Sequence, residues 1–417
     1  MSGPQWIALI ALAALYVLLL GDWFHRAWVA LGLAGALVVS RTITFAAAFH
    51  SVDWNTLALI GGMMLFVSQL ADAGLFVLLG HWARSWSRGK PWRLLWIFYV
   101  LTAVVSAFLD NVTTVLLLSP ILIDAAEELE LDPVPLLLME VVASNLGGMA
   151  TLIGDPPNIL VGTAARLTFF QFVQMMTPIA VIILTLLALV LPVFLRLKPL
   201  ASEHRTVRSA KRTSVGPNPR LKGLLVILAM MLLGFVAQRP LHLAVGIIAL
   251  GGAAAAILYT GRVGQRWYRH VDYGTLGFFV GVFILVGALE SVGLIDTLAR
   301  WMDRPGLGPW LPLLLFIGTA LFSALLDNVP LVAALIPVVV HLNAVDPRFG
   351  VELWVAIAMG AAIGGNATVI GASANVVVQG LAVERGYALS FGQFMRYGWK
   401  VAAFTALIGA AYLTVRF

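Results

Sequence analysis

Two short acidic motifs carry the residue types and spacing that point to chemistry. Each is an aspartate followed by an asparagine, Asp110-Asn111 and Asp327-Asn328, and each interrupts a long apolar run. A carboxylate at membrane depth costs roughly 2.5–3.5 kcal/mol on insertion scales, so such a residue is by default a functional one. Because a carboxyl group can exchange protons or hold cations, the two motifs predict proton or ion coupling. The alternative is that each aspartate only caps the helix that follows it.

Two glycine-rich motifs accompany the acidic pair, one in each half of the chain. Glycine and proline interrupt a helix and free backbone N–H and C=O groups, which in a membrane must then bind a neighbour, water, an ion or a solute. We therefore expect a broken helix at each motif. The residues predicted to break the backbone are Gly147, Gly148, Gly154, Pro156, Pro157, Gly364, Gly365 and Gly371.

The polar side chains of these four motifs form the predicted site. The residues assigned to proton or ion coupling are Asp110, Asp155 and Asp327. Asp155 has no acidic counterpart in the second half, where Ala372 stands, so capping of the Pro156–Pro157 helix is an equal alternative for it. The residues predicted to bind solute are neutral donors and acceptors: Asn111, Thr113, Asn145, Thr151, Asn158, Asn328, Asn366, Thr368, Ser373 and Asn375.

Other polar residues receive a structural interpretation. Glu140, Asp72 and Glu290 also lie in apolar runs, but outside the four motifs, and structural pairing is the preferred interpretation for them. The seven histidines have no ligand spacing, and no cysteine is present to supply a thiolate, so we predict no metal site and no catalytic residue.

Composition places these motifs in a membrane protein. Of the 417 residues, 61% are hydrophobic and 11% charged, and the mean hydropathy is +0.96. A soluble domain is closer to half apolar and a quarter charged. The net charge of +6 comes from basic residues between apolar runs, which fits membrane topology rather than nucleic-acid binding. No phosphate-binding loop occurs, so pumping by ATP within this chain alone is not expected.

The motifs need long helices to position them. We expect an all-α polytopic protein with about ten transmembrane helices and two re-entrant hairpins, because a span needs about 20 apolar residues. The hairpins are predicted at 92–125 and 309–343, with broken helices at 134–166 and 351–383. The remaining spans are expected near 5–21, 26–48, 55–80, 172–196, 221–238, 241–260, 273–299 and 394–416.

The chain repeats itself in order, and this predicts its domains and topology. The motifs of the second half follow those of the first by 217 to 222 residues, giving repeats at 1–196 and 221–417 around a basic linker at 197–220. Five spans per repeat invert the second copy. Positive residues favour the cytoplasmic side, so the linker is expected inside and both termini outside. Inverted repeats with broken helices at the midplane are typical of secondary transporters.

The motifs resemble a known superfamily. The stretches Phe108–Thr114, Gly147–Asn158 and Gly364–Asn375 resemble the ion transporter superfamily, in the branch of arsenite permeases, silicic-acid efflux transporters and the melanosomal P protein. Divalent anion/sodium symporters are more distantly similar. The resemblance implies a scaffold domain and an elevator-like transport domain. Relatives that carry dicarboxylates have Ser-Asn-Thr at the hairpin tips, whereas Asp-Asn-Val stands at both tips here, which disfavours a dianionic solute.

These observations lead to one functional hypothesis and several rivals. The leading expectation is proton-coupled efflux of arsenite or antimonite across the inner membrane, with no cofactor beyond the proton gradient and sodium as an alternative ion. The rivals are sodium/proton antiport, silicic-acid transport and anion symport. An intramembrane aspartyl protease is disfavoured because Gly-x-Gly-Asp is missing. The expected partners are a small inorganic solute and membrane lipid, without nucleic acid, while a homodimer and a separate ATPase partner stay open.

Overall fold

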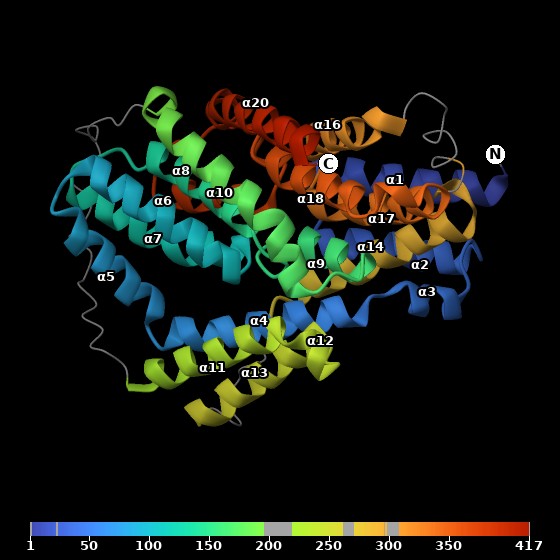
Figure 1. Cartoon of the computed structure of the whole chain (residues 1–417), viewed down its shortest axis with the longest axis horizontal. Helices are drawn as coiled ribbons and strands as arrows, with labels where there is room; N and C mark the ends of the chain where they lie inside the picture. Colours follow the sequence, from blue (N-terminus) through green and yellow to red (C-terminus); the bar gives the residue numbers. More distant parts are fainter. Residues whose placement is uncertain are drawn as a thin grey trace.

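The fold is all-helical throughout the part of the chain that the computed structural model describes (Figure 1). That part comprises residues 2–21, 24–195, 219–261, 271–295, 297 and 308–416. Seven helices within it are long and apolar enough to cross a membrane. The predicted linker at 197–220 falls almost wholly outside the described residues.

A first set of helices forms what we call the outer group. Helix α2 packs along α14, α4 packs along α13, and α1 and α11 lie against these pairs. The lower part of Figure 1 shows α4, α11 and α13 side by side. The outer group consists of α1 (Gly3–Gly21), α2 (Arg26–Val39), α4 (Trp54–Asp72), α11 (Pro219–Val236), α13 (Val245–Thr260) and α14 (Tyr273–Ser291). Short helices α3 (Phe45–Ser51) and α12 (Gln238–Leu241) flank it.

The second set, which we call the hairpin group, contains the two hairpins and the two broken helices. The first hairpin is α6 (Pro91–Phe108) and α7 (Asn111–Glu128), and the second is α16 (Leu311–Ser323) and α17 (Asn328–Val345). The broken helices are α8 (Val134–Gly148) with α9 (Pro156–Ala164), and α18 (Glu352–Gly364) with α19 (Ser373–Glu384). The group is completed by α10 (Phe169–Phe194) and α20 (Phe391–Arg416), while α5 (Leu75–Ser87) connects it to α4. Two 3₁₀ turns, η3 (Gly308–Trp310) and η4 (Pro347–Phe349), precede α16 and α18.

The hairpin group interleaves the two halves of the sequence. Helices α6 and α8 pack together, as do α16 and α18, whereas α7 packs against α19 and α17 against α9. Glycine allows the close contact of α6 with α8 and of α16 with α18. A Cβ at Gly147 would meet the carbonyl of Ala103, and one at Gly364 would meet that of Ala320. Each hairpin therefore sits directly on the backbone of the broken helix from its own half.

Local sequence explains why the hairpins and broken helices end where they do. Asp110 and Asp327 are the N-cap residues of α7 and α17, and each accepts a backbone N–H of the first turn, from Thr113 and Val329. The capping alternative is thus realised at both tips. Pro156 and Pro157 occupy the first two positions of α9, where a missing N–H is harmless. In each half a helix thus begins directly after the tip aspartate, and another ends at the Gly-Gly pair.

Two of the expected single spans are divided in the structure. The stretch 26–48 separates into α2 and α3 around Arg41, which has a positive φ of 57°. The stretch 55–80 separates into α4 and α5 around Gly74, whose φ is 84°. A residue in the left-handed conformation, most often glycine, commonly ends a helix. Hydrophobicity does not report this conformation, so the expected spans were too long at both places.

Candidate functional site: an acidic cavity between the two groups

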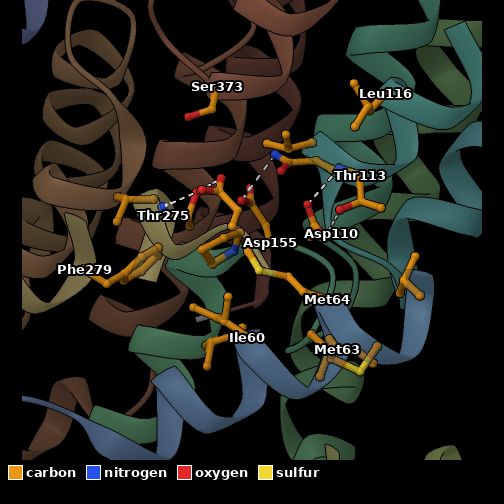
Figure 2. Close-up of a pocket in the computed structure, with 18 of the residues that line it drawn as sticks. Ile60, Met63, Met64, Asp110, Thr113, Leu116, Asp155, Thr275, Phe279 and Ser373 are labelled. Carbon is orange, nitrogen blue, oxygen red and sulfur yellow. Dashed lines mark hydrogen bonds between the residues drawn. The ribbon is translucent and has the colours of Figure 1, made fainter. Parts of the chain in front are cut away.

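A cavity of about 310 Å³ lies where the hairpin group faces the outer group. Its hairpin-group wall carries Asp110, Asp155, Asp327 and Ser373, and its outer-group wall is formed by residues of α2, α4 and α14. Figure 2 shows Asp155 and Asp110 side by side, Thr275 and Ser373 across from Asp110, and Ile60, Met63 and Met64 of α4 beneath them. The charged residues among the lining are one guanidinium, Arg26, and five carboxylates: Asp72, Asp110, Asp155, Asp272 and Asp327.

Five helices begin at this cavity. The N-cap residues of α7, α9, α14 and α17 are all aspartates, and all four line the cavity. The fifth helix, α19, has Ala372 as its N-cap, and its first residue, Ser373, lines the cavity. A helix N-terminus carries partial positive charge, so the aspartates offset a field that would otherwise attract anions. The cavity combines this field with an excess of carboxylates.

Asp155 joins the tips of both hairpins. Only 2% of its surface is exposed. One carboxylate oxygen accepts a hydrogen bond from Asn111 Nδ2 at 3.3 Å, and the other accepts one from Asn328 Nδ2 at 3.5 Å. It makes no side-chain capping bond to α9, so the capping alternative does not describe it. A single carboxylate thus holds together equivalent residues from the two halves of the chain.

The two tip aspartates differ in their partners. Asp110 accepts hydrogen bonds from the backbone N–H and from the hydroxyl of Thr113, at 2.8 and 2.5 Å, all within its own helix. Asp327 instead accepts the hydroxyl of Ser373 from α19, at 2.9 Å. Both carboxylates are partly accessible, because Asp110 and Asp327 line the cavity and are not fully covered. Of the two tip aspartates, Asp327 is therefore the one whose side chain accepts a hydrogen bond from another helix.

Six of the predicted solute-binding residues lie behind the cavity wall instead of on it. Asn158 donates to the carbonyls of Gly148 and Thr151, both at 2.9 Å, and Asn375 donates to those of Gly365 and Thr368, both at 2.7 Å. These bonds satisfy carbonyls freed at each break. The remaining four are likewise occupied by protein groups: Asn145 by Asn366 and Asn375, Asn366 by Ala362, Thr151 by Ala107, and Thr368 by Ala324. The structure brings Asn111, Thr113, Asn328 and Ser373 to the cavity.

Several lining residues were missed by sequence reasoning. Arg26 and Thr275 supply polar groups, Phe278 lies under the Arg26 guanidinium at 5.8 Å, and Met63 and Met64 supply thioethers. A basic residue at the start of a span resembles an ordinary topology signal, so nothing in the sequence distinguished Arg26. In the described part of the chain, no three histidine, aspartate or glutamate side chains are grouped so as to hold a metal ion.

The buried Glu140 makes a structural contact, as expected from the sequence, but through only one of its two carboxylate oxygens. It lies on α8, is fully buried, and accepts the hydroxyl of Ser119 of α7 at 2.7 Å on one oxygen. Glu140 does not line the cavity. Its contact joins α7 to α8 within the hairpin group.

Comparison with known proteins agrees with this architecture. The family model described as citrate transporter (CitMHS) matches residues 16–360 and 306–417, which together cover most of the chain. The chain belongs to the citrate transporter family. The family lies within the ion transporter superfamily, so the resemblance seen in the four motifs is confirmed at that level.

Relatives of this CitMHS chain include proteins named as transporters. An uncharacterized transporter of Mycobacterium tuberculosis is 38% identical over 99% of this chain and 98% of its own length. The human P protein is 30% identical over 98% of this chain, which corresponds to 59% of the P protein. Among solved structures, the YdaH transporter of Alcanivorax borkumensis shares the fold with a TM-score of 0.60, at 17% identity over 89% of this chain and 87% of that one. The protein is a polytopic membrane transporter.

Proposed function

We propose that this transporter couples inward proton movement to efflux of a small, neutral, hydroxyl-rich solute, with arsenite and antimonite as the first substrates to test. The observation that carries the proposal is the grouping of Asp110, Asp155 and Asp327 with amide and hydroxyl groups around one cavity. Carboxylates exchange protons, and amides and hydroxyls hydrogen-bond an uncharged hydroxylated solute without desolvating a charge.

The charge of the cavity argues against a bare polyanion as the solute. Five carboxylates face one guanidinium, and like charges within a few ångströms repel strongly in a low-dielectric site. Citrate, which gives the family its printed name, carries several negative charges at neutral pH. We therefore place citrate and other anions below a neutral solute for this chain.

The roles of the lining residues follow from their positions. Asp110 and Asp327 exchange protons with solution, and Asp155 keeps the two tips in register through Asn111 and Asn328. Thr113 and Ser373 provide hydroxyls for the solute. The chain has no cysteine, so recognition rests on oxygen contacts, supplemented by the thioethers of Met63 and Met64. Silicic acid offers similar hydroxyls and belongs to the same test.

Sodium/proton antiport is the second candidate, and the number of carboxylates at the cavity favours it. A hard cation prefers oxygen ligands, which Asp110, Asp155 and Asp327 can supply. The described residues hold no preassembled group of three such ligands, so sodium would draw on carbonyl or amide oxygens as well. This requirement places sodium second.

The membrane setting belongs to the same proposal. We place the chain in the inner membrane with the basic linker in the cytoplasm and both termini outside, following the distribution of positive charge. The proton gradient is the energy source, sodium is the alternative, and neither a cofactor nor an ATPase partner is needed. A homodimer is compatible with the scheme.

The experiment is accumulation of radioactive arsenite in everted membrane vesicles, with and without an imposed proton gradient and without ATP. Gradient-driven accumulation that is lost in Asp110→Asn supports the proposal. Antimonite, silicic acid and citrate are tested in the same vesicles, and sodium-driven proton movement is followed without any solute. If a sodium gradient alone drives proton movement and no hydroxylated solute accumulates, sodium/proton antiport replaces our proposal.

A further inference from the structure

Arg26 connects the outer group to the hairpin group. It is the first residue of α2, and its guanidinium donates to Thr275 Oγ1 of α14 at 2.6 Å and forms an ion pair with Asp272 at 3.6 Å. These contacts fix it to the outer group. The same guanidinium also donates to Ser373 Oγ of α19 at 3.1 Å. A displacement of the hairpin group along the outer group must break this last bond.

The bond from Arg26 continues to a tip carboxylate. Ser373 accepts from Arg26 and donates its own proton to Asp327 Oδ2 at 2.9 Å. A hydroxyl between a cation and an anion makes two charge-assisted hydrogen bonds, each stronger than a neutral one. The strength of the connection therefore depends on the negative charge of Asp327.

The three residues stand between two cavities rather than inside packed protein. A second cavity of about 320 Å³ lies on the other side of them. Arg26, Ser373 and Asp327 line both cavities, and the walls specific to the second come from α1, α2, the second tip and α19. The bonds therefore border open space in two cavities, so they can break and reform without opening a packed core.

Among the described residues, the connection is found in the second half of the sequence and not at the equivalent place in the first. The residue that corresponds to Ser373 in the first half is Pro156, which has no hydroxyl. Asp110, which corresponds to Asp327, accepts Thr113 from its own helix and has no hydrogen bond to a residue of the outer group among those found. Capping of α17 therefore does not explain why Asp327 also accepts the hydroxyl of Ser373.

We propose that Arg26 is a positioning residue that holds the hairpin group against the outer group while Asp327 is deprotonated and no solute is bound. This rests on the proposed function, because it takes Asp327 as a proton-exchanging group. A proton on Asp327 removes the charge that holds Ser373, and a solute that binds Ser373 replaces the same bond. The empty, deprotonated transporter is then the state that cannot move, which prevents solute from crossing without proton exchange.

Several titratable or charged groups surround Asp327 and bear on any pH dependence. Tyr16 of α1 and His25 and Arg26 at the start of α2 line the second cavity with it. Asp272 of α14, Asp72 of α4, and Asp110 and Asp155 of the hairpin group line the first. The variants Asp327→Asn and His25→Gln separate the charge of Asp327 from that of the histidine.

The first test compares two kinds of transport in proteoliposomes that contain the full chain. In Arg26→Gln we expect proton-driven arsenite accumulation to fall at least about tenfold, while downhill arsenite flux stays within about twofold of the wild type. Arg385→Gln is the matched control, because Arg385 forms a 2.9 Å ion pair with Asp124 that lies wholly within the hairpin group. Equal loss of both kinds of transport, or loss of neither, in Arg26→Gln overturns the proposal.

The second test needs no solute and so separates this inference from the choice of substrate. The chain has no cysteine, so spin labels at Trp28→Cys on α2 and Val383→Cys on α19, both exposed positions, report the distance between the two groups. In the wild type, in Arg385→Gln and in His25→Gln, we expect a narrow distance distribution at alkaline pH that broadens on acidification. Arg26→Gln and Asp327→Asn should be broad at both pH values.

The two tests fail in different ways. If arsenite is not transported but the distances behave as expected, the substrate is wrong and the role of Arg26 stands. If Arg26→Gln gives the same distances as the wild type at both pH values, Arg26 does not hold the groups together and the inference is refuted.

Discussion

Replacement of Asn375 or Asn158 by leucine tests whether these buried amides hold the helix breaks or bind solute. Leucine keeps the volume and removes the hydrogen bonds. Asn375 makes three: two to the carbonyls of Gly365 and Thr368, and one accepted from Asn145. Asn158 makes the equivalent two to Gly148 and Thr151, and its Oδ1 has no partner.

The two substitutions should lower stability by different amounts, with the larger loss in Asn375→Leu. Removing one partner of a buried hydrogen bond leaves the other unsatisfied and costs about 1–3 kcal/mol, so Asn375→Leu should lower the free energy of unfolding by at least about 3 kcal/mol and Asn158→Leu by at least about 2 kcal/mol. Unfolding is followed by titration with a denaturing detergent in mixed micelles. The folded fraction of each variant should transport with an unchanged KM, because neither side chain lines the cavity.

The reasoning is refuted by either of two results. Equal and negligible losses of stability would mean that the freed carbonyls are satisfied in another way. A large increase in KM with stability intact would mean that the amides contact the solute, as their motifs alone suggest.

Three further predictions concern other contacts. Gly147→Ala should prevent stable folding, because its Cβ would meet the carbonyl of Ala103, whereas Gly251→Ala, with open space around it, should be neutral or stabilising by up to about 1 kcal/mol; expression and melting temperature in detergent compare the two. Asp155→Asn should reduce proton-driven transport at least about tenfold in vesicles, because the amide keeps one acceptor oxygen but turns an NH2 donor toward the Nδ2 of Asn111 or of Asn328, which is itself a donor; wild-type rates in this variant would contradict the role of Asp155. Burial and its bond to Glu127 raise the pKa of Tyr387, in the turn before α20, so its contribution to stability is present below the ordinary tyrosine pKa of about 10 and is lost as pH rises above that value. Tyr387→Phe should be the less stable protein at pH 8, and the difference should shrink at higher pH.

The elements governed by local chemistry could be predicted from the sequence. An Asp-Asn pair inside an apolar run marks a helix start, and Gly-Gly and Pro-Pro mark a helix end and the next beginning, and helices begin and end at these motifs in the structure. The division at Gly74 was missed because apolar residues continue on both sides of it, and hydrophobicity does not report a left-handed φ.

The residues that line the site were harder to predict from the sequence, for a physical reason. An asparagine near a helix break has the same sequence signature whether its amide faces a solute or a freed carbonyl. The direction of the side chain is decided by packing of α6 on α8 and of α16 on α18. Arg26 and Thr275 reach the cavity only because α2 and α14, far apart in sequence, lie together.

The convergence of five helix N-termini on one cavity has a consequence for how the solute specificity of this fold can change in evolution. The backbone there is oriented to attract negative charge, and the aspartates that cap α7, α14 and α17, together with Asp155 at the start of α9, are what reverse that preference. Serine or threonine caps a helix equally well without a charge. Exchange of the capping residues would therefore preserve the helices while it inverts the sign of the ligand that the cavity attracts. Charge selectivity in such a scaffold can evolve through a handful of helix caps, with the transport machinery left as it is.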